Sequence, residues 1–375
     1  MRKFNSLLSV TLCLSLAGSV VCLPQAFAGS SVKGAVINVP GQTGKSVNVA
    51  VGKETRADQS SIKLQNLDMG GGGAIVNTDR TGQSVNIAAG NKASARQSSI
   101  RVGGKLQGAV VNTNLVNKNV NVAAGNEVKA NQGSVDITDS KVTGAVVNTA
   151  VGRNAVNIGA GSNVEADQSS VRLENGEVRG AVANTSVIGQ AVNIGAGNRV
   201  EAGQSSVIMK DSKVTGAVVN TAVGQNMVNI GAGNRIEADQ ATVRMSGSSV
   251  EGAVVNTAVG QNLVNVAAGN RAEARQVATS LKNSKVSGAV VNTAVSQNLV
   301  NVAAGNRVEA NQAATKMENS SLTGAAVNTI GALGGVNVAA GNRAEANQGA
   351  VKMENSKVRG ALVNTAVGGG INVAA

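Results

Sequence analysis

Apolar and small residues recur along the chain with a period of 36 residues. In the copy that opens at Gly252, a first apolar run spans about residues 250–259, a second about 263–268 and a third about 272–281, each ending at a short stretch rich in Gly, Asn or Ser. β-Branched residues bounded in this way favour strands, and no run has the i, i+3, i+4 spacing of a long amphipathic helix. The pattern therefore predicts an all-β fold with roughly three strands per repeat.

The same repeat fills almost the whole chain. Copies open with glycine at positions 34, 73, 108, 144, 180, 216, 252, 288, 324 and 360. A fixed period of this length is typical of stacked repeats, which share one core along their axis and do not close separate cores. We expect residues 29–375 to form one continuous domain, a single-chain parallel β-solenoid of about nine and a half 36-residue layers with cross-β stacking.

Three polar columns run through the repeats. The first holds Asn77, Asn112, Asn148, Asn184, Asn220, Asn256, Asn292, Asn328 and Asn364; the second holds Asn86, Asn121, Asn157, Asn193, Asn229, Asn265, Asn301 and Asn337; and the third holds Gln97, Gln132, Gln168, Gln204, Gln240, Gln276, Gln312 and Gln348. Layers of a solenoid lie about 4.8 Å apart, and a primary amide can both donate and accept. Each amide is therefore expected to bond to its own copies above and below.

Alternation predicts which way the side chains point. In one third strand Gln168 points inward, yet Val171 and Leu173 must also point inward, so we expect a bend near Ser169 and Ser170. The first strand carries no charge on either side, which predicts that both of its faces are covered, as in a Greek-key-like layer. The alternative is a triangular coil whose second apolar face packs against a neighbouring fibre.

Charged residues also form columns. One holds Arg199, Arg235, Arg271, Arg307 and Arg343, and another, two residues further on, holds Glu201, Glu237, Glu273, Glu309 and Glu345. We expect the two columns to offset each other as a solvated stripe of salt bridges. The formal net charge of +12 leaves room for weak contact with a polyanion or polysaccharide. No basic block or aromatic platform supports a specific nucleic-acid site.

The first 28 residues have the pattern of a secretory signal peptide. Arg2 and Lys3 precede an apolar run that ends at small residues Ala26 and Ala28, and the run is too short for a stable membrane span. The chain holds no histidine, and its two cysteines, Cys13 and Cys22, lie in this segment. We therefore expect an exported protein without a transmembrane segment, and no enzyme, cofactor or metal site.

Repeats begin close to the expected cleavage site, and the chain ends two strands into a tenth layer. No capping segment is recognisable at either end, and an uncapped layer presents a bare strand edge. Head-to-tail stacking of identical chains would satisfy both edges and yield an open fibre. The sequence thus predicts that the principal partner of this chain is another copy of itself.

The run GVNVAAGNRAEANQGAVKM, residues 335–353, and its copies resemble the repeat of the Fap-type functional amyloid subunits of bacterial biofilms. A looser similarity to curlins lies in the spaced Asn and Gln residues. The resemblance implies that the amide columns are the stacking residues of an extracellular cross-β fibre of the biofilm matrix or cell surface. A nucleator or minor subunit and an outer-membrane secretion pore are further partners that such a fibre would use.

A second class of function stays open at this stage. A monomeric β-solenoid could act at the cell surface as an adhesin, or as an ice-binding protein. The ice-binding face would be the threonine column Thr113, Thr149, Thr185, Thr221, Thr257, Thr293, Thr329 and Thr365. The sequence alone does not decide whether the fibre or the monomeric rod is the working form.

Overall fold

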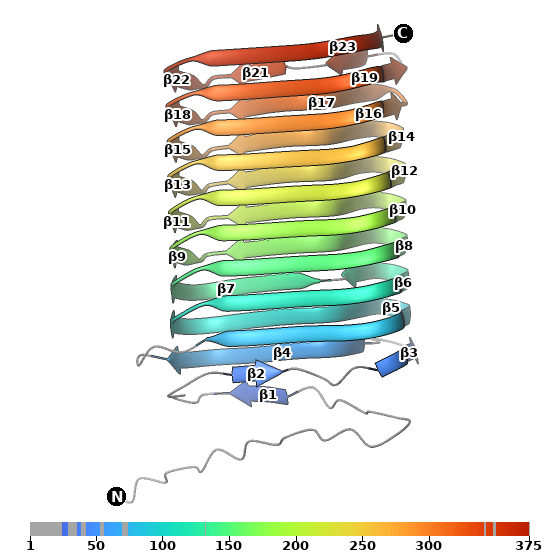
Figure 1. Ribbon diagram of the computed structural model, residues 1–375, viewed down its shortest axis with the longest axis vertical. Coiled ribbons are helices and arrows are strands. Elements are labelled where there is room, and N and C mark those ends of the chain that lie inside the picture. Colours follow the sequence, from blue (N-terminus) through green and yellow to red (C-terminus); the bar gives the residue numbers. More distant parts are fainter. Residues whose placement is uncertain are drawn as a thin grey trace, which may run out of the picture.

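The chain forms a parallel β-solenoid, seen in a computed structural model that describes residues 25–28, 36–38, 43–52, 56–69, 74–131, 133–340, 343–347 and 350–374 (Figure 1). Its described part contains strands and no helix, and every pairing between strands is parallel. The predicted fold class is confirmed. The solenoid has about seven turns, so the predicted nine and a half layers is slightly too many: seven complete repeats lie between Gly108 and Arg359, with incomplete coils on either side.

The less regular strands come first. They are β1 (Gln25–Ala28), β2 (Val36–Asn38), β3 (Thr43–Gly52), β4 (Arg56–Met69), β5 (Ile75–Gln107), β6 (Val110–Asn131) and β7 (Ser134–Thr143). From there a long and a three-residue strand alternate: β8 (Val146–Glu174), β9 (Glu177–Arg179), β10 (Val182–Lys210), β11 (Lys213–Thr215), β12 (Val218–Ser246), β13 (Ser249–Glu251), β14 (Val254–Lys282) and β15 (Lys285–Ser287). The last turns comprise β16 (Val290–Ala304), β17 (Arg307–Glu318), β18 (Ser321–Thr323), β19 (Ala326–Ala340), β20 (Arg343–Asn347), β21 (Ala350–Glu354), β22 (Lys357–Arg359) and β23 (Leu362–Ala374).

Each layer has three sides. In the layer built by β12, residues 218–223 form the first side, residues 227–232 the second and residues 235–246 the third. The three predicted strands are these three sides, but the parallel pairing continues around both corners, so one 29-residue strand covers all of them. At the two corners the register omits Gln225 and Asn234 and resumes on the next side.

Identical residues lie on top of one another. Val182 pairs with Val218, Asn184 with Asn220 and Asn193 with Asn229, and the same 36-residue offset continues to the next layer. The repeat period therefore sets the register directly. A residue in one layer therefore lies directly beside the equivalent residue, often the same amino acid, in the next layer.

Two apolar clusters fill the interior. In the β12 layer, Val218, Val243 and Met245 belong to the larger cluster, while Met227 and Ala241 belong to the smaller one. The third side changes parity between them, because Gln240 and Ala241 are adjacent and both buried. The register between β10 and β12 omits Gln240, which has no paired residue in β10. The bend predicted near the small residues is thus confirmed.

The first side has only one covered face. Val219 and Thr221 point outward and are partly exposed, as are their copies in the neighbouring layers. The predicted Greek-key-like covering is therefore wrong, and the three-sided coil, the weaker alternative from the sequence, is correct. Uncharged residues such as Val and Thr suit a buried and a half-exposed face of a strand equally well, so alternation could not separate the two arrangements.

Candidate functional site

The first asparagine column is a buried hydrogen-bonded ladder. Asn148 Nδ2 donates to Asn184 Oδ1 over 2.9 Å, and Asn184 and Asn220 each donate to the next copy over the same distance. Asn220 Nδ2 also donates to the carbonyl oxygens of Ser205 and Thr242 on the third side. The ladder therefore links successive layers along the axis, and it also links the first side of the coil to the third side. The same bond joins Asn112 to Asn148, Asn292 to Asn328 and Asn328 to Asn364.

The second asparagine column forms a continuous ladder. Asn229 Nδ2 donates to Asn265 Oδ1 and Asn265 Nδ2 to Asn301 Oδ1, each over 3.0 Å, and these side chains are fully buried. Asn265 Nδ2 also donates to the Ala238 carbonyl. The remaining members bond in the same way, Asn121 to Asn157, Asn157 to Asn193, Asn193 to Asn229 and Asn301 to Asn337. Both predicted asparagine ladders exist, the first with a break between Asn256, which donates to the Ala241 and Ala278 carbonyls, and Asn292.

The glutamine column is not a ladder of the predicted kind. Gln240 Nε2 donates to the backbone oxygens of Met227, 3.0 Å away in its own layer, and Val264, 2.6 Å away in the next. Gln204 Nε2 and Gln276 Nε2 each donate in the same way to one backbone oxygen on the second side of their own layer and to one on the second side of the next layer. The longer side chain reaches across the corner to the backbone, which a shorter asparagine could not do. Each glutamine thus fastens the third side to the second sides of two successive layers.

Some members of the columns lie outside this geometry. Gln132 and Gln348 are not among the described residues, and neither is the side chain of Gln168. Gln312 Nε2 donates to the Val336 carbonyl. Asn364 lies in β23, the last described layer, where it accepts from Asn328 while its own side chain is exposed.

A serine column at the turn was missed by sequence reasoning. Ser212 N–H donates to Ser248 Oγ, Ser248 N–H to Ser284 Oγ and Ser284 N–H to Ser320 Oγ, over 3.0–3.3 Å. The residue before each serine has positive φ, +48° at Asp211 and +60° at Gly247. The signal was present in the recurring Asn-Ser and Asp-Ser pairs, since Asn, Asp and Gly are the residues that adopt this conformation most readily.

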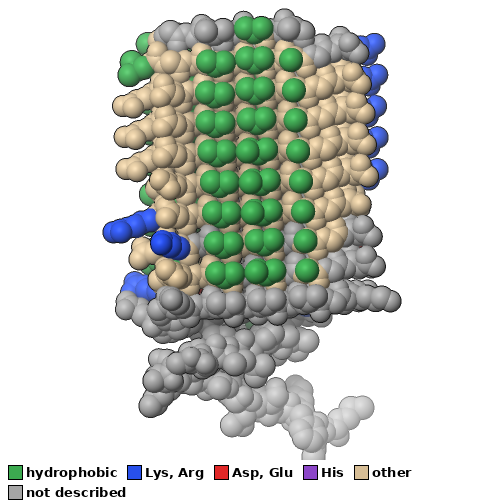
Figure 2. All heavy atoms as spheres, turned by 90° about the vertical axis from the view of Figure 1, so that its right-hand side faces the viewer, with side chains coloured by type: hydrophobic (Ala, Val, Ile, Leu, Met, Phe, Trp, Pro, Cys, Tyr) green, Lys and Arg blue, Asp and Glu red, His purple; other side chains and the backbone are tan. Residues whose placement is uncertain are grey.

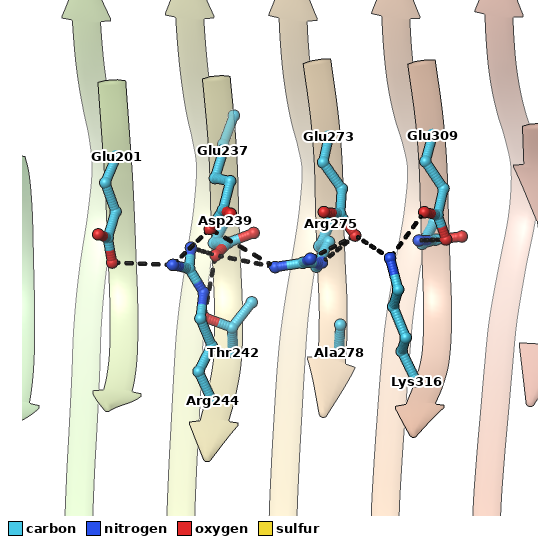
Figure 3. Close-up of polar contacts among 12 residues, drawn as sticks. Glu201, Glu237, Asp239, Thr242, Arg244, Glu273, Arg275, Ala278, Glu309 and Lys316 are labelled. Atoms are coloured by element: carbon cyan, nitrogen blue, oxygen red, sulfur yellow. Dashed lines mark hydrogen bonds and ion pairs between the residues drawn. The ribbon is translucent and has the colours of Figure 1, made fainter. Parts of the chain in front are cut away.

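The glutamate column is neutralised by cations within the third side. Figure 3 shows carboxylates and cations in contact within and between successive layers. Arg244 contacts Glu201, Glu237 and Asp239, Arg275 contacts Glu273, and Lys316 Nζ lies 3.1 Å from Glu309 Oε2 and 3.6 Å from Glu273 Oε1. The sequence assigned these glutamates to the wrong partners: Arg275 lies two residues after Glu273 on the same arm, while Arg244 and Lys316 lie on the opposite arm of the third side and also reach a glutamate of a neighbouring layer.

The arginine column stays without a counter-charge. Arg199, Arg235, Arg271, Arg307 and Arg343 are exposed at the corner between the second and third sides, and none forms an ion pair with a described carboxylate. They form the row of basic side chains along one edge in Figure 2. The predicted salt-bridge stripe is therefore wrong for these residues: the glutamates turn toward other cations, and the arginines face solvent.

Burial and charge shift the pKa of several carboxyl groups. Burial alone would raise the pKa of Glu165, but Arg172 and Lys129 lie against it and bring that pKa down to about 2. Burial raises the pKa of Asp167 well above its usual value, and Glu165 and Glu201 add to that effect. Burial likewise raises the pKa of Asp79 to about 6. Glu165 therefore carries the structural ion pair, while Asp79 and Asp167 are poorly solvated.

The outward face of the second side is purely aliphatic. Figure 2 views this face, where apolar side chains form straight columns parallel to the axis. In the β12 layer the columns contain Val228, Ile230 and Ala232. We call this surface the aliphatic face. It has no counterpart on the first side, where the middle outward column is threonine, Thr221 in this layer.

The described residues contain no cluster of three metal-ligating side chains, and no helix among them is long and apolar enough to cross a membrane. A scan against protein-family models, a search of curated proteins and a search of solved structures each found no match to the chain.

Proposed function

We propose that this chain is an exported structural subunit that stacks end to end with its own copies into an extracellular cross-β fibre of a biofilm matrix or cell surface. The observation that carries the proposal is that all complete layers join by the same contact. Backbone hydrogen bonds, the second asparagine ladder and the apolar columns repeat from one layer to the next. A layer that can bind the next layer within the chain can bind the equivalent layer of another chain.

The outer edge of β23 offers that contact. At the inner junctions the N–H that starts each long strand donates to the next layer, Val254 to Ala289 and Val290 to Ala325, both over 2.8 Å, and Ala326 to Ala361 over 2.9 Å. Leu362 is the equivalent of Ala326 and Val290, so its N–H points away from β19. Among the described residues no layer lies beyond β23. A strand edge that no described layer covers is a template for pairing with another chain.

The test removes that donor and leaves the internal hydrogen bonds in place. Proline lacks the N–H and is tolerated at an edge, so Leu362→Pro is expected to stop filament growth while leaving the chain folded. Leu362→Val, which retains the N–H, is the matched control and is expected to grow filaments. Growth is followed by electron microscopy and light scattering, and folding by far-UV circular dichroism. Equal filament growth in the two variants would contradict the proposal.

One observation favours a second function. The threonine column, Thr221 and its copies, lies on the outward face of the first side and not in a covered interior. A regular row of hydroxyl and methyl groups is compatible with the ice-binding alternative, or with an adhesive surface on a monomeric rod. Thr221→Lys and Thr257→Lys together would then abolish thermal hysteresis. Absence of thermal hysteresis in the parent protein would remove the ice-binding function.

A further inference from the structure

The aliphatic face consists of the outward side chains of the second side in eight successive layers. Its members are Val85, Ile87, Ala89, Val120, Val122, Ala124, Val156, Ile158, Ala160, Val192, Ile194, Ala196, Val228, Ile230, Ala232, Val264, Val266, Ala268, Val300, Val302, Ala304, Val336, Val338 and Ala340. No polar or charged side chain interrupts them. Parallel stacking keeps the columns straight, so the surface is flat along its length (Figure 2).

The size of this face matches what a stable interface requires. Three outward residues per layer, two positions apart, span about 20 Å including their side chains, and eight layers at about 4.8 Å extend over about 38 Å. The face therefore offers about 760 Å² per copy, or about 1,500 Å² when two copies meet, which is within the range of specific protein interfaces. Contiguous apolar patches of this size are uncommon on monomeric proteins.

Two corners border the face, and in the seven layers named below no layer carries a cation on both of them. The corner after the second side, here the arginine edge, holds Glu127, Asn163, Arg199, Arg235, Arg271, Arg307 and Arg343. The corner before it, here the glutamine edge, holds Lys118, Arg153, Gln190, Gln225, Gln261, Gln297 and Leu333 in the same layers. All of these side chains are exposed. The two layers with a cation on the glutamine edge are those in which the arginine edge has Glu or Asn.

We propose that two copies of the chain pair through their aliphatic faces, parallel and in register, about a two-fold axis that runs along the solenoid. This rotation brings the arginine edge of each copy against the glutamine edge of the other. Lys118 then meets Glu127 twice, Arg153 meets Asn163, and Arg199 meets Gln190. An antiparallel pair would instead place one arginine edge against the other, at a cost in like-charge repulsion.

Pairing through the aliphatic faces does not depend on end-on stacking at β23, so either proposal can be refuted while the other holds. The experiment uses the full chain with Leu362→Pro, which limits growth at the β23 edge, and measures the oligomeric state by analytical ultracentrifugation over a concentration series. A dimer is expected. Ile230→Lys, in the middle column of the face, should convert it to a monomer with an unchanged circular dichroism spectrum. Val255→Lys is the matched control on the outward first side and should leave the dimer intact.

Charge reversal then tests the orientation. Glu127→Lys should weaken the dimer about tenfold, because both copies lose one edge contact. Adding Lys118→Glu to that variant should restore the affinity. A monomer at every concentration, equal dissociation by Ile230→Lys and Val255→Lys, or a dimer insensitive to Glu127→Lys would each overturn the proposal. Binding of a monomer to neutral or anionic lipid vesicles, lost on Ile230→Lys, would assign the face to a membrane surface and also overturn it.

Discussion

At the scale of single residues, the choice of amino acid is most restricted where the backbones of two successive layers lie directly on one another. The glycine that opens each repeat has φ near +140°, +142° at Gly252. A Cβ added there would lie 2.1 Å from the carbonyl oxygen of Gly216 in the layer below. Both the backbone conformation and the lack of space therefore require glycine at this column.

Gly252→Ala is expected to destabilise the fold by about 2–4 kcal/mol, through a strained backbone and a clash with the preceding layer. Gly331→Ala is the control, because a Cβ at Gly331 meets nothing within 4 Å and the paired residue in the layer below is Val295. The midpoint of denaturant unfolding compares the two. Similar midpoints for both variants would show that the opening glycine has no such role.

Buried and exposed asparagines of the same chain should differ in their contribution to stability. Asn265→Ala leaves Asn229 without its acceptor and Asn301 without its donor inside the coil, which costs about 2–3 kcal/mol. Asn306 also bonds to its lower neighbour, Asn270, but at an exposed corner, so Asn306→Ala should cost less than about 0.5 kcal/mol. Thermal unfolding of the two variants measures the difference, and equal losses would contradict a special role for the buried ladder.

Asp79 should make stability depend on pH. Its pKa in the folded state, raised by burial to about 6, exceeds its ordinary value of 3.8. The protonated form is favoured in the folded state, so its contribution is complete below about pH 4 and is lost as the pH rises through about 6. Asp79→Asn cannot ionise and should gain at most about 3 kcal/mol over the parent at pH 7. Urea unfolding between pH 4 and pH 7 tests this, and a difference between variant and parent that is constant over this range would refute it.

At the scale of elements, the period predicts how layers stack but not how one layer folds. The offset of 36 residues fixes which residues lie above one another, and so the asparagine ladders follow from the sequence. Contacts within the coil follow no such rule: Gln240 bonds to backbone 13 and 24 residues away, and Arg244 reaches Glu201 43 residues before it. These distances depend on where the two corners bend, which periodicity does not specify. The glutamine bonds, the glutamate partners and the exposed first side were therefore not predictable.

The third side depends on its internal ion pairs and not on the arginine edge. Arg244→Ala would leave Asp239, whose side chain is 1% exposed, without its nearest cation, and removal of one partner from a buried pair costs about 3 kcal/mol. Arg235→Ala removes an exposed arginine with no described counter-charge and should change stability by less than about 0.5 kcal/mol. Denaturant unfolding of both variants compares them, and a larger loss for Arg235→Ala would mean that the pairing has been misassigned.

At the scale of the whole molecule, the solenoid presents two kinds of surface that could extend it. The edge of β23 repeats the contact between layers and would add copies along the axis. The aliphatic face would add a second column of copies beside the first. Replacing Asn256, Asn265 and Gln276 together by alanine should weaken stacking along the axis, while Arg271→Ala should have little effect on it.

The most direct test of end-on stacking is electron microscopy of the protein diluted from denaturant into buffer over a concentration series. Long unbranched filaments with a cross-β spacing of about 4.8 Å along the axis are the predicted result. Uniform rods about 34 Å long at every concentration, the length of a single chain of about seven turns at this spacing, would show that the layer edges do not bind other copies and would contradict the account.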